Sequence, residues 1–225
     1  MHIIYLFLAL ALSNTINSNY TSLNREVYDV QSSEIDSNIY YTILPFKTIL
    51  DKEMNTVLCH SKQEMKKTKP ESLLGNWTSD VCLEIAQEIY EDDIDLSFFN
   101  NGGLRSPIPK GDITKSDLYK LMPFENELVV LELNKTEILD LKAYYKFTKG
   151  QPIAFVDDFS LNDSLFLVLT TDYLANGGDK MKFFKEKKQH KVGIKMRDAL
   201  IKYCLKKDTI SSKLDERHLI LFDAK

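Results

Sequence analysis

The chain has 225 residues, of which 44% are hydrophobic and 28% are charged. This composition is typical of a soluble globular protein, and the length allows one sizeable hydrophobic core, so one domain is the default expectation. The formal net charge of −4 gives no overall positive field. We therefore expect no nucleic-acid binding, and an anionic ligand would have to be held by local positive groups.

The amino terminus has the pattern of a signal peptide. An apolar run from Ile3 to Leu12 is followed by Ser13 and a polar stretch. The run is short for a bilayer span, so we expect cleavage after residue 13 or as late as about 19, no membrane span in the mature chain, and export to a periplasmic or extracellular location. An uncleaved anchor is the alternative. Residues 14–37 predict an irregular lead-in, and residues 38–225 a single domain.

The first elements of this domain are predicted from composition. Residues 39–44, Ile-Tyr-Tyr-Thr-Ile-Leu, have the composition of a strand that Pro45 ends. Residues 46–54 then predict a short helix and residues 55–65 an extended segment. A helix from Glu71 to about Tyr90 carries an apolar residue at every fourth position, namely Trp77, Val81, Ile85 and Ile89.

Two helix starts have capping patterns. Thr114 with Asp117 predicts a helix through Leu121, and Asn134 with Glu137 predicts a helix to about Tyr145. Predicted strands occupy residues 94–99, 128–133 and 165–171, and further helices occupy residues 180–187 and 193–205. The lysines in residues 180–207 are expected on the solvated faces of amphipathic helices. The irregular alternation of elements predicts an α+β fold with helices packed on a mixed sheet.

Three predicted loops carry candidate binding residues. Residues 100–105, Asn-Asn-Gly-Gly-Leu-Arg, combine glycines that let backbone N–H groups approach a ligand with an arginine suited to phosphate oxygens. Phe124 lies between Pro123 and a turn and could offer its face to a base. Tyr173 could form a second stacking wall, and Asp179 could accept hydrogen bonds from a vicinal diol such as ribose.

Each loop also has a plain structural interpretation. The first could be a Gly-Gly turn with a surface arginine, Phe124 a core residue, and Asp179 a helix N-cap. Together, however, the loops supply an aromatic pair, a cation and a diol acceptor, which are the parts of a nucleoside monophosphate site. We therefore predict substrate-binding roles for seven residues: Asn100, Gly102, Gly103, Arg105, Phe124, Tyr173 and Asp179.

The chain also resembles a known family. Residues 70–76, 100–108, 122–133 and 173–179 look like successive signature blocks of the 5'-nucleotidase C-terminal domain, in the order of that family. The resemblance covers roughly residues 40–205. It implies a domain that binds the nucleotide, whereas a calcineurin-like domain in such enzymes holds two metal ions and the nucleophilic water.

The resemblance also implies roles for single residues. Phe124 and Tyr173 match the two aromatics that sandwich the base, with Tyr173 standing where phenylalanine is usual. Arg105 matches an arginine directed at the substrate phosphate, Asn100 an asparagine near the base, and Asp179 an aspartate on the ribose hydroxyls.

The chain departs from the family pattern at three places. Asn101 replaces the first of three loop glycines, which could stiffen the loop. A phosphate-binding arginine that family members carry before the Glu-Ser segment is absent, and lysines at residues 66–69 could replace it as point charges. The segment between Tyr145 and Leu165 is shorter than usual and retains only Gly-Gln-Pro at residues 150–152.

Cysteine and histidine usage indicates no metal centre in this chain. The three cysteines are widely spaced and are interpreted as buried apolar residues, with a Cys59–Cys82 disulfide as an alternative. The four histidines lack neighbouring metal-ligand motifs, so we expect no catalytic residue, metal or cofactor of its own. The prediction is thus a substrate-binding subunit of a 5'-nucleotidase-type phosphohydrolase, whose separate metallophosphatase chain holds two divalent metals. The alternative is an extracytoplasmic binding protein for nucleosides or nucleotide sugars without enzyme activity.

Overall fold

The computed structural model describes residues 36–221. The chain divides into two compact units, Met1–Leu44 and Pro45–Lys225. The predicted signal peptide and almost all of the predicted lead-in lie outside the described residues. Across the described range, no helix is both long enough and apolar enough to cross a membrane.

The first described element is a helix, α2 (Ser37–Met54), where a strand was predicted at residues 39–44. The Asp36 carboxylate accepts hydrogen bonds from the backbone N–H groups of Asn38 at 2.8 Å and Ile39 at 3.1 Å, which caps the first turn. Pro45 lies inside the helix and does not end it. The strand prediction was wrong because β-branched and aromatic residues favour a strand only where they pack on a sheet, and none of the α2 residues is buried.

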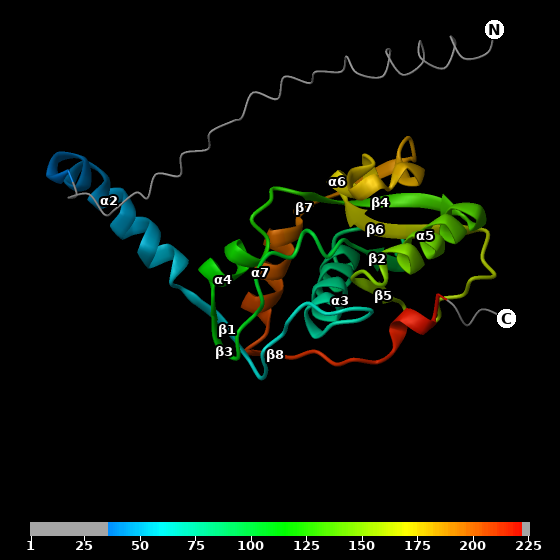
Figure 1. Cartoon of the computed structure of the whole chain (residues 1–225), viewed down its shortest axis with the longest axis horizontal. Coiled ribbons are helices and arrows are strands. Elements are labelled where there is room, and N and C mark those ends of the chain that lie inside the picture. Colours follow the sequence, from blue (N-terminus) through cyan, green and yellow to red (C-terminus); the bar gives the residue numbers. More distant parts are fainter. Residues whose placement is uncertain (1–35, 222–225) are drawn as a thin grey trace, which may run out of the picture. The chain divides into compact units, whose positions relative to one another are not determined.

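A mixed five-stranded sheet forms the centre of the larger unit (Figure 1). Strands β2 and β6 run parallel, and the other neighbouring pairs run antiparallel. This arrangement confirms the predicted α+β fold with a mixed sheet. In spatial order the strands are β5 (Ile153–Phe155), β2 (Leu96–Phe98), β6 (Leu165–Thr171), β4 (Glu127–Asn134) and β7 (Gln189–Lys195).

Helices pack on this sheet, and two of them begin where the capping patterns predict. Thr114 and Asn134 form complete capping boxes with Asp117 and Glu137, as expected from their spacing. Ile89 lies beyond the end of its helix and is 41% exposed, so it is not part of the predicted apolar stripe. The α-helices of the larger unit after α2 are α3 (Leu73–Gln87), α4 (Lys115–Leu121), α5 (Lys135–Thr148), α6 (Asp172–Ala175) and α7 (Met196–Lys206).

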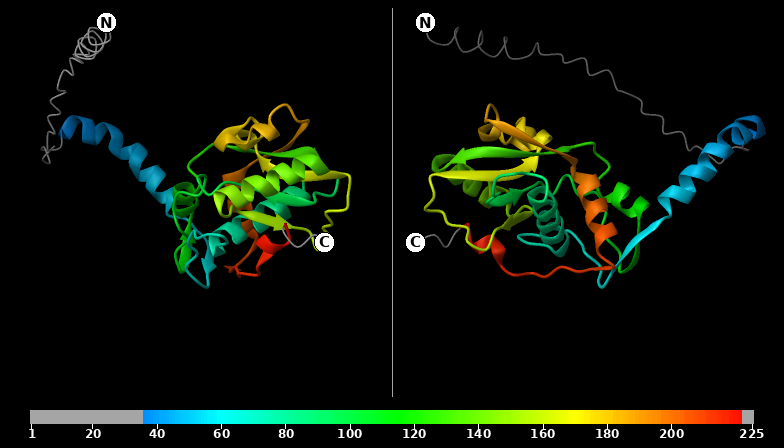
Figure 2. Two further views of the ribbon diagram at one scale, coloured as in Figure 1. Left: turned by 45° about the vertical axis from the view of Figure 1, so that its right-hand side comes forward. Right: turned by 180° about the vertical axis from the view of Figure 1, so that it is seen from behind.

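Strand β4 separates two hydrophobic cores. Leu128 and Val130 belong to a core shared with α3, α4 and α7, whereas Val129 and Leu131 belong to a core shared with α5 (Figure 2). Successive side chains of a strand point to opposite faces, so a strand covered on both faces must be apolar at every position. This explains the continuous Leu-Val-Val-Leu run.

A second, three-stranded sheet contains β3 (Gly111–Thr114), β1 (Val57–Ser61) and β8 (Thr209–Ile210) in that order. All three cysteines are free and buried, as the sequence predicts. The Cys59 thiol is hydrogen-bonded with that of Cys204 on α7, so the alternative Cys59–Cys82 pairing is not formed.

The lysine-rich segment after β6 differs from its prediction. Residues 180–187 form no α-helix but two short 3₁₀ turns, Gly178–Lys180 and Lys182–Phe184. The next residues form β7, and the last helix begins at Met196 rather than Gly193. Strand β7 pairs with β4, and ion pairs such as Lys191–Glu127 at 3.0 Å link the two strands. These partners lie about 60 residues away in the sequence, so local periodicity could not reveal the strand.

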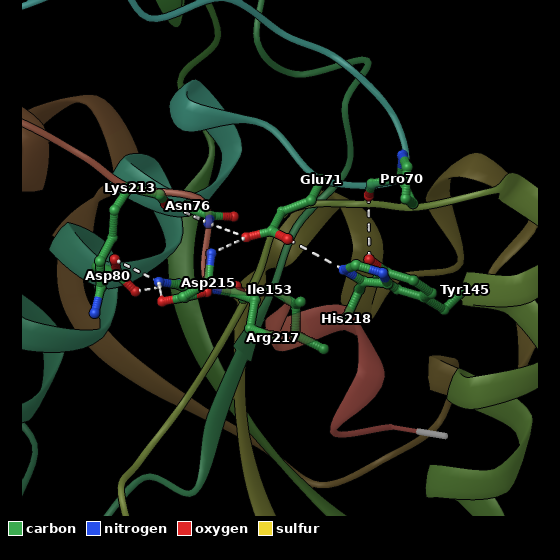
Figure 3. Close-up of polar contacts among 10 residues, drawn as sticks. All are labelled: Pro70, Glu71, Asn76, Asp80, Tyr145, Ile153, Lys213, Asp215, Arg217 and His218. Atoms are coloured by element: carbon green, nitrogen blue, oxygen red, sulfur yellow. Dashed lines mark hydrogen bonds and ion pairs between the residues drawn. The ribbon is translucent and has the colours of Figure 1, made fainter. Parts of the chain in front are cut away.

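Arg217 attaches the C-terminal segment to the body of the larger unit (Figure 3). Its guanidinium is largely buried and donates hydrogen bonds to both Asp80 on α3 and Asp215, and to the Ile153 carbonyl of β5 at 3.3 Å. The guanidinium is buried, whereas the side chains of Asp80 and Asp215 are 50% and 28% exposed. Loss of the guanidinium leaves two neighbouring carboxylates uncompensated. Arg217 is therefore expected to contribute strongly to stability.

We predict that Arg217→Met lowers the free energy of unfolding by about 2 to 3 kcal/mol, because Asp80 and Asp215 lose their shared partner. Urea denaturation followed by circular dichroism measures this change. Lys191→Met is the control, since the Lys191–Glu127 pair is exposed and such pairs contribute about 0 to 1 kcal/mol. Equal losses in the two variants would contradict the prediction.

Candidate functional site

The seven predicted site residues line one cavity of about 280 Å³. The structure adds one residue that the sequence analysis did not single out, Asn126. The lining residues are Asn100, Gly102, Gly103, Arg105, Phe124, Asn126, Tyr173 and Asp179.

The strand pairing brings these residues together. Strands β2 and β6 are parallel neighbours, so the loops at their carboxyl ends meet at one edge of the sheet. Strand β4 is antiparallel to β6, so its amino end lies at that same edge. The loop with Asn100 follows β2, Tyr173 lies on α6 directly after β6, and Phe124 precedes β4.

The glycine-containing loop after β2 is held by groups on other segments. The backbone N–H of Asn101 donates to the Gln151 side chain at 2.7 Å. The side-chain amide of Asn101 donates to the Gly150 carbonyl at 3.1 Å. The Lys67 ammonium donates to the carbonyls of Asn101 at 2.8 Å and Leu104 at 2.7 Å. The retained Gly-Gln-Pro segment and one of the three candidate lysines therefore position this loop.

Arg105 projects from this loop beside Phe124. Its backbone N–H donates to the Leu121 carbonyl at 2.8 Å, and its guanidinium carbon lies 6.0 Å from the centre of the Phe124 ring. Partial burial of the Lys67 ammonium is the main cause that lowers its pKa, and the neighbouring positive charge of Arg105 lowers it further. The two cations thus lie close together, and Arg105 is the one that lines the cavity, where it could attract an anionic group.

Phe124 is 41% exposed, so its interpretation as a core residue is excluded. Arg197 of α7 lies behind it and donates to the carbonyls of Met122 at 3.2 Å and Phe124 at 3.3 Å. Arg197 also forms an ion pair with Glu125, and its hydrogen bond, with that of Lys195, lowers the pKa of Glu125 to about 2. Arg197 is buried and fixes the segment that presents the ring.

Sequence reasoning missed Arg197. Arg197 is the only arginine in residues 180–207, where every other basic side chain except His190 is a lysine. That difference in composition was the one feature of the sequence that could have singled it out. A planar guanidinium can donate to several carbonyls and a carboxylate at once, which a lysine ammonium does with less directional control.

Tyr173 also lines the cavity and is 46% exposed. Its hydroxyl donates to Asp179 Oδ1 at 2.9 Å, and the amide of the buried Asn100 donates to Asp179 Oδ2. Asp179 has a left-handed backbone with φ of 49° and lies within a short 3₁₀ turn whose N-cap is Gly177. The interpretation of Asp179 as a helix N-cap is therefore wrong.

The described histidines each contact one carboxylate. His60 lies 3.1 Å from Asp112, His190 lies 2.8 Å from Glu132, and His218 lies 3.1 Å from Glu71. Within residues 36–221, no three or more His, Cys, Asp or Glu side chains gather in a way that could hold a metal ion.

The fold and the cavity define an α+β domain whose loops converge at one sheet edge to present two exposed aromatic rings, an arginine and a carboxylate. Residues 52–141 match the model of the 5'-nucleotidase C-terminal domain family. This match confirms the resemblance seen in the sequence over the matched region.

Similar proteins agree with this assignment. An apyrase from Tabanus yao is 27% identical over 152 residues, which are 51% of this chain and 27% of the apyrase. A trifunctional nucleotide phosphoesterase from Bacillus subtilis is 38% identical over 82 residues, 36% of this chain and 5% of that protein. The chain therefore spans much less than half the length of these curated relatives.

The fold also matches a solved structure. The 5'-nucleotidase precursor from Thermus thermophilus superimposes with a TM-score of 0.65 and 22% identity, over 79% of this chain and 42% of that one. At this identity the match concerns the fold, and it supports the predicted α+β architecture.

We predict that Gly178→Ala displaces Tyr173 from the cavity wall. A Cβ atom at this position would lie 2.5 Å from a carbon of the Tyr173 ring, which is too close for any real contact. A crystal structure of the variant measures the displacement. Gly111→Ala is the control, because its Cβ would meet no atom within 4 Å while its φ of 107° imposes backbone strain, so that strain without a clash is tested separately. An unmoved Tyr173 ring in the Gly178 variant would contradict the prediction.

Proposed function

We propose that this chain is the nucleotide-binding part of a 5'-nucleotidase-type phosphohydrolase. The observation that carries the proposal is the meeting of Phe124, Tyr173, Arg105 and Asp179 in one cavity. These four side chains come from three separate segments of the chain, and each has the chemistry that one part of a nucleotide requires.

The proposed arrangement assigns one part of the ligand to each group. The base would lie between the exposed rings of Phe124 and Tyr173, since aromatic faces stack on bases of any kind. The ribose hydroxyls would bond to Asp179, and the phosphate would lie towards Arg105, whose planar fork suits phosphate oxygens. Asn100 and Asn126 would provide amide groups near the base, and Gly102 and Gly103 would allow the loop backbone to approach the ligand closely.

Hydrolysis is proposed to come from a separate metallophosphatase chain that holds two divalent metals. This chain aligns with 42% of the Thermus thermophilus 5'-nucleotidase precursor, so the aligned region represents only part of such an enzyme. A two-metal centre activates water and stabilises the leaving oxygen, which is chemistry that binding residues alone do not supply.

The proposed site of action is outside the cytoplasm. The apolar run at residues 3–12 supports export, and the similar Thermus thermophilus protein is described as a precursor. A binding protein for nucleosides or nucleotide sugars, without enzymatic activity, is the second candidate, because the exposed rings and Asp179 suit any ligand that contains a nucleoside.

We predict that AMP binds the protein and that Phe124→Ala weakens binding by about tenfold or more, since stacking of a base on an aromatic ring contributes about 1 to 3 kcal/mol. Arg105→Met should weaken binding of AMP but not of adenosine, which lacks the phosphate. Isothermal titration calorimetry with AMP, adenosine and a nucleotide sugar measures these affinities.

Phe147→Ala is the matched control, because Phe147 is 79% exposed on α5 and does not line the cavity. Absence of binding for all three ligands would refute both candidate functions. Tight binding of adenosine with no contribution from Arg105 would favour the nucleoside-binding protein.

We further predict that the purified chain does not hydrolyse AMP when divalent metals are supplied. Release of inorganic phosphate measures the reaction, with a purified 5'-nucleotidase as the positive control for the assay. Sustained turnover that co-purifies with this chain through several columns would refute the proposed division of labour.

A further inference from the structure

The hydroxyl of Tyr173 closes a small hydrogen-bonded ring with Asp179. It donates to Asp179 Oδ1 at 2.9 Å and accepts from the backbone N–H of Asp179 at 3.2 Å. A single hydroxyl thus fixes both the side chain and the backbone of a residue six positions later. Phenylalanine at this position would keep the aromatic face and lose both bonds.

The carboxylate of Asp179 is held at both oxygen atoms. Tyr173 bonds to Oδ1 and Asn100 bonds to Oδ2, so neither oxygen can rotate away without loss of a hydrogen bond. An ionised carboxylate has about four acceptor positions, so about two remain for a ligand in the cavity. Two positions match the two hydroxyl groups of a vicinal diol.

The backbone around Asp179 is also fixed. The Tyr144 hydroxyl donates to the Asp179 carbonyl at 3.0 Å, and the Tyr173 ring lies so close to Gly178 that no Cβ atom fits between them. The left-handed conformation of Asp179 is tolerated because aspartate adopts this region more readily than most residues. The carboxylate therefore has one orientation, set before any ligand binds.

We propose that the Tyr173 hydroxyl is a specificity-determining group that positions Asp179 to accept both hydroxyls of a ribose. This inference rests on the proposed nucleotide-binding function and goes beyond the stacking role of the ring. A ligand with both hydroxyls satisfies the two remaining acceptor positions, whereas a ligand that covers the carboxylate without them displaces water and leaves those positions unpaired. The site then selects ribonucleotides over nucleotides that lack the diol.

The experiment compares AMP with 2',3'-dideoxyAMP, which keeps the base and the phosphate and lacks the diol. We expect the native protein to bind AMP about 10- to 100-fold more tightly than the dideoxy compound, as hydrogen bonds to a charged group allow. Tyr173→Phe should weaken AMP binding by about tenfold and binding of the dideoxy compound by less than about twofold. The preference for the diol therefore falls.

A double-mutant cycle tests whether the hydroxyl acts through Asp179. Asp179→Asn should abolish the preference for AMP, and Tyr173→Phe should cause no further loss of that preference in the Asp179→Asn background. Additive losses would contradict a shared mechanism and overturn the inference.

Other outcomes are equally decisive. If Tyr173→Phe weakens both ligands equally, the hydroxyl supports the loop in general and the inference is wrong. If the native protein binds both ligands with the same affinity, the inference fails while the proposed function stands. If the native protein binds neither ligand, the proposed function fails as well.

Discussion

The pairing of β6 with β2 on one side and β4 on the other is the constraint on which the site depends. The parallel β2–β6 pair places two loops at the same sheet edge, and the antiparallel β4 begins at that edge. Strands β4 and β6 contribute side chains to both hydrophobic cores and β2 is buried throughout, so their register is specified by packing. A change in this register would separate the two aromatic walls of the cavity.

Groups behind the cavity hold its loops in place. Arg197 binds the backbone beneath Phe124, Lys67 and Gln151 bind the loop after β2, and the Tyr173 hydroxyl binds the loop after β6. Such support matters because a loop that must order on binding reduces affinity by the entropy it loses. The exposed rings can therefore stay accessible to a ligand without being free to collapse onto each other.

The seven predicted site residues were accessible to sequence reasoning because distinctive side chains stand beside turn signals. Glycine pairs, a proline beside Phe124 and an aspartate after a glycine turn all mark strand ends, where loops present side chains. Asn126 and Arg197 were missed because an exposed amide and a single arginine among lysines have no local pattern. Strand β7 was missed because its pairing partners are distant in the sequence.

The sequence by itself determined the local features of this protein: the two capping boxes, the apolar runs of β4 and β6, the turns at the sheet edge and the family resemblance of the region 52–141. These depend on short-range chemistry, such as hydrogen bonds from side chains to nearby backbone groups and the period of apolar residues. Only the tertiary structure decided that residues 39–44 are helical, that residues 189–195 form a strand, and that Tyr173 and Asn100 both bind Asp179. Those outcomes depend on which surfaces are buried and which distant segments meet, and local patterns do not encode that information.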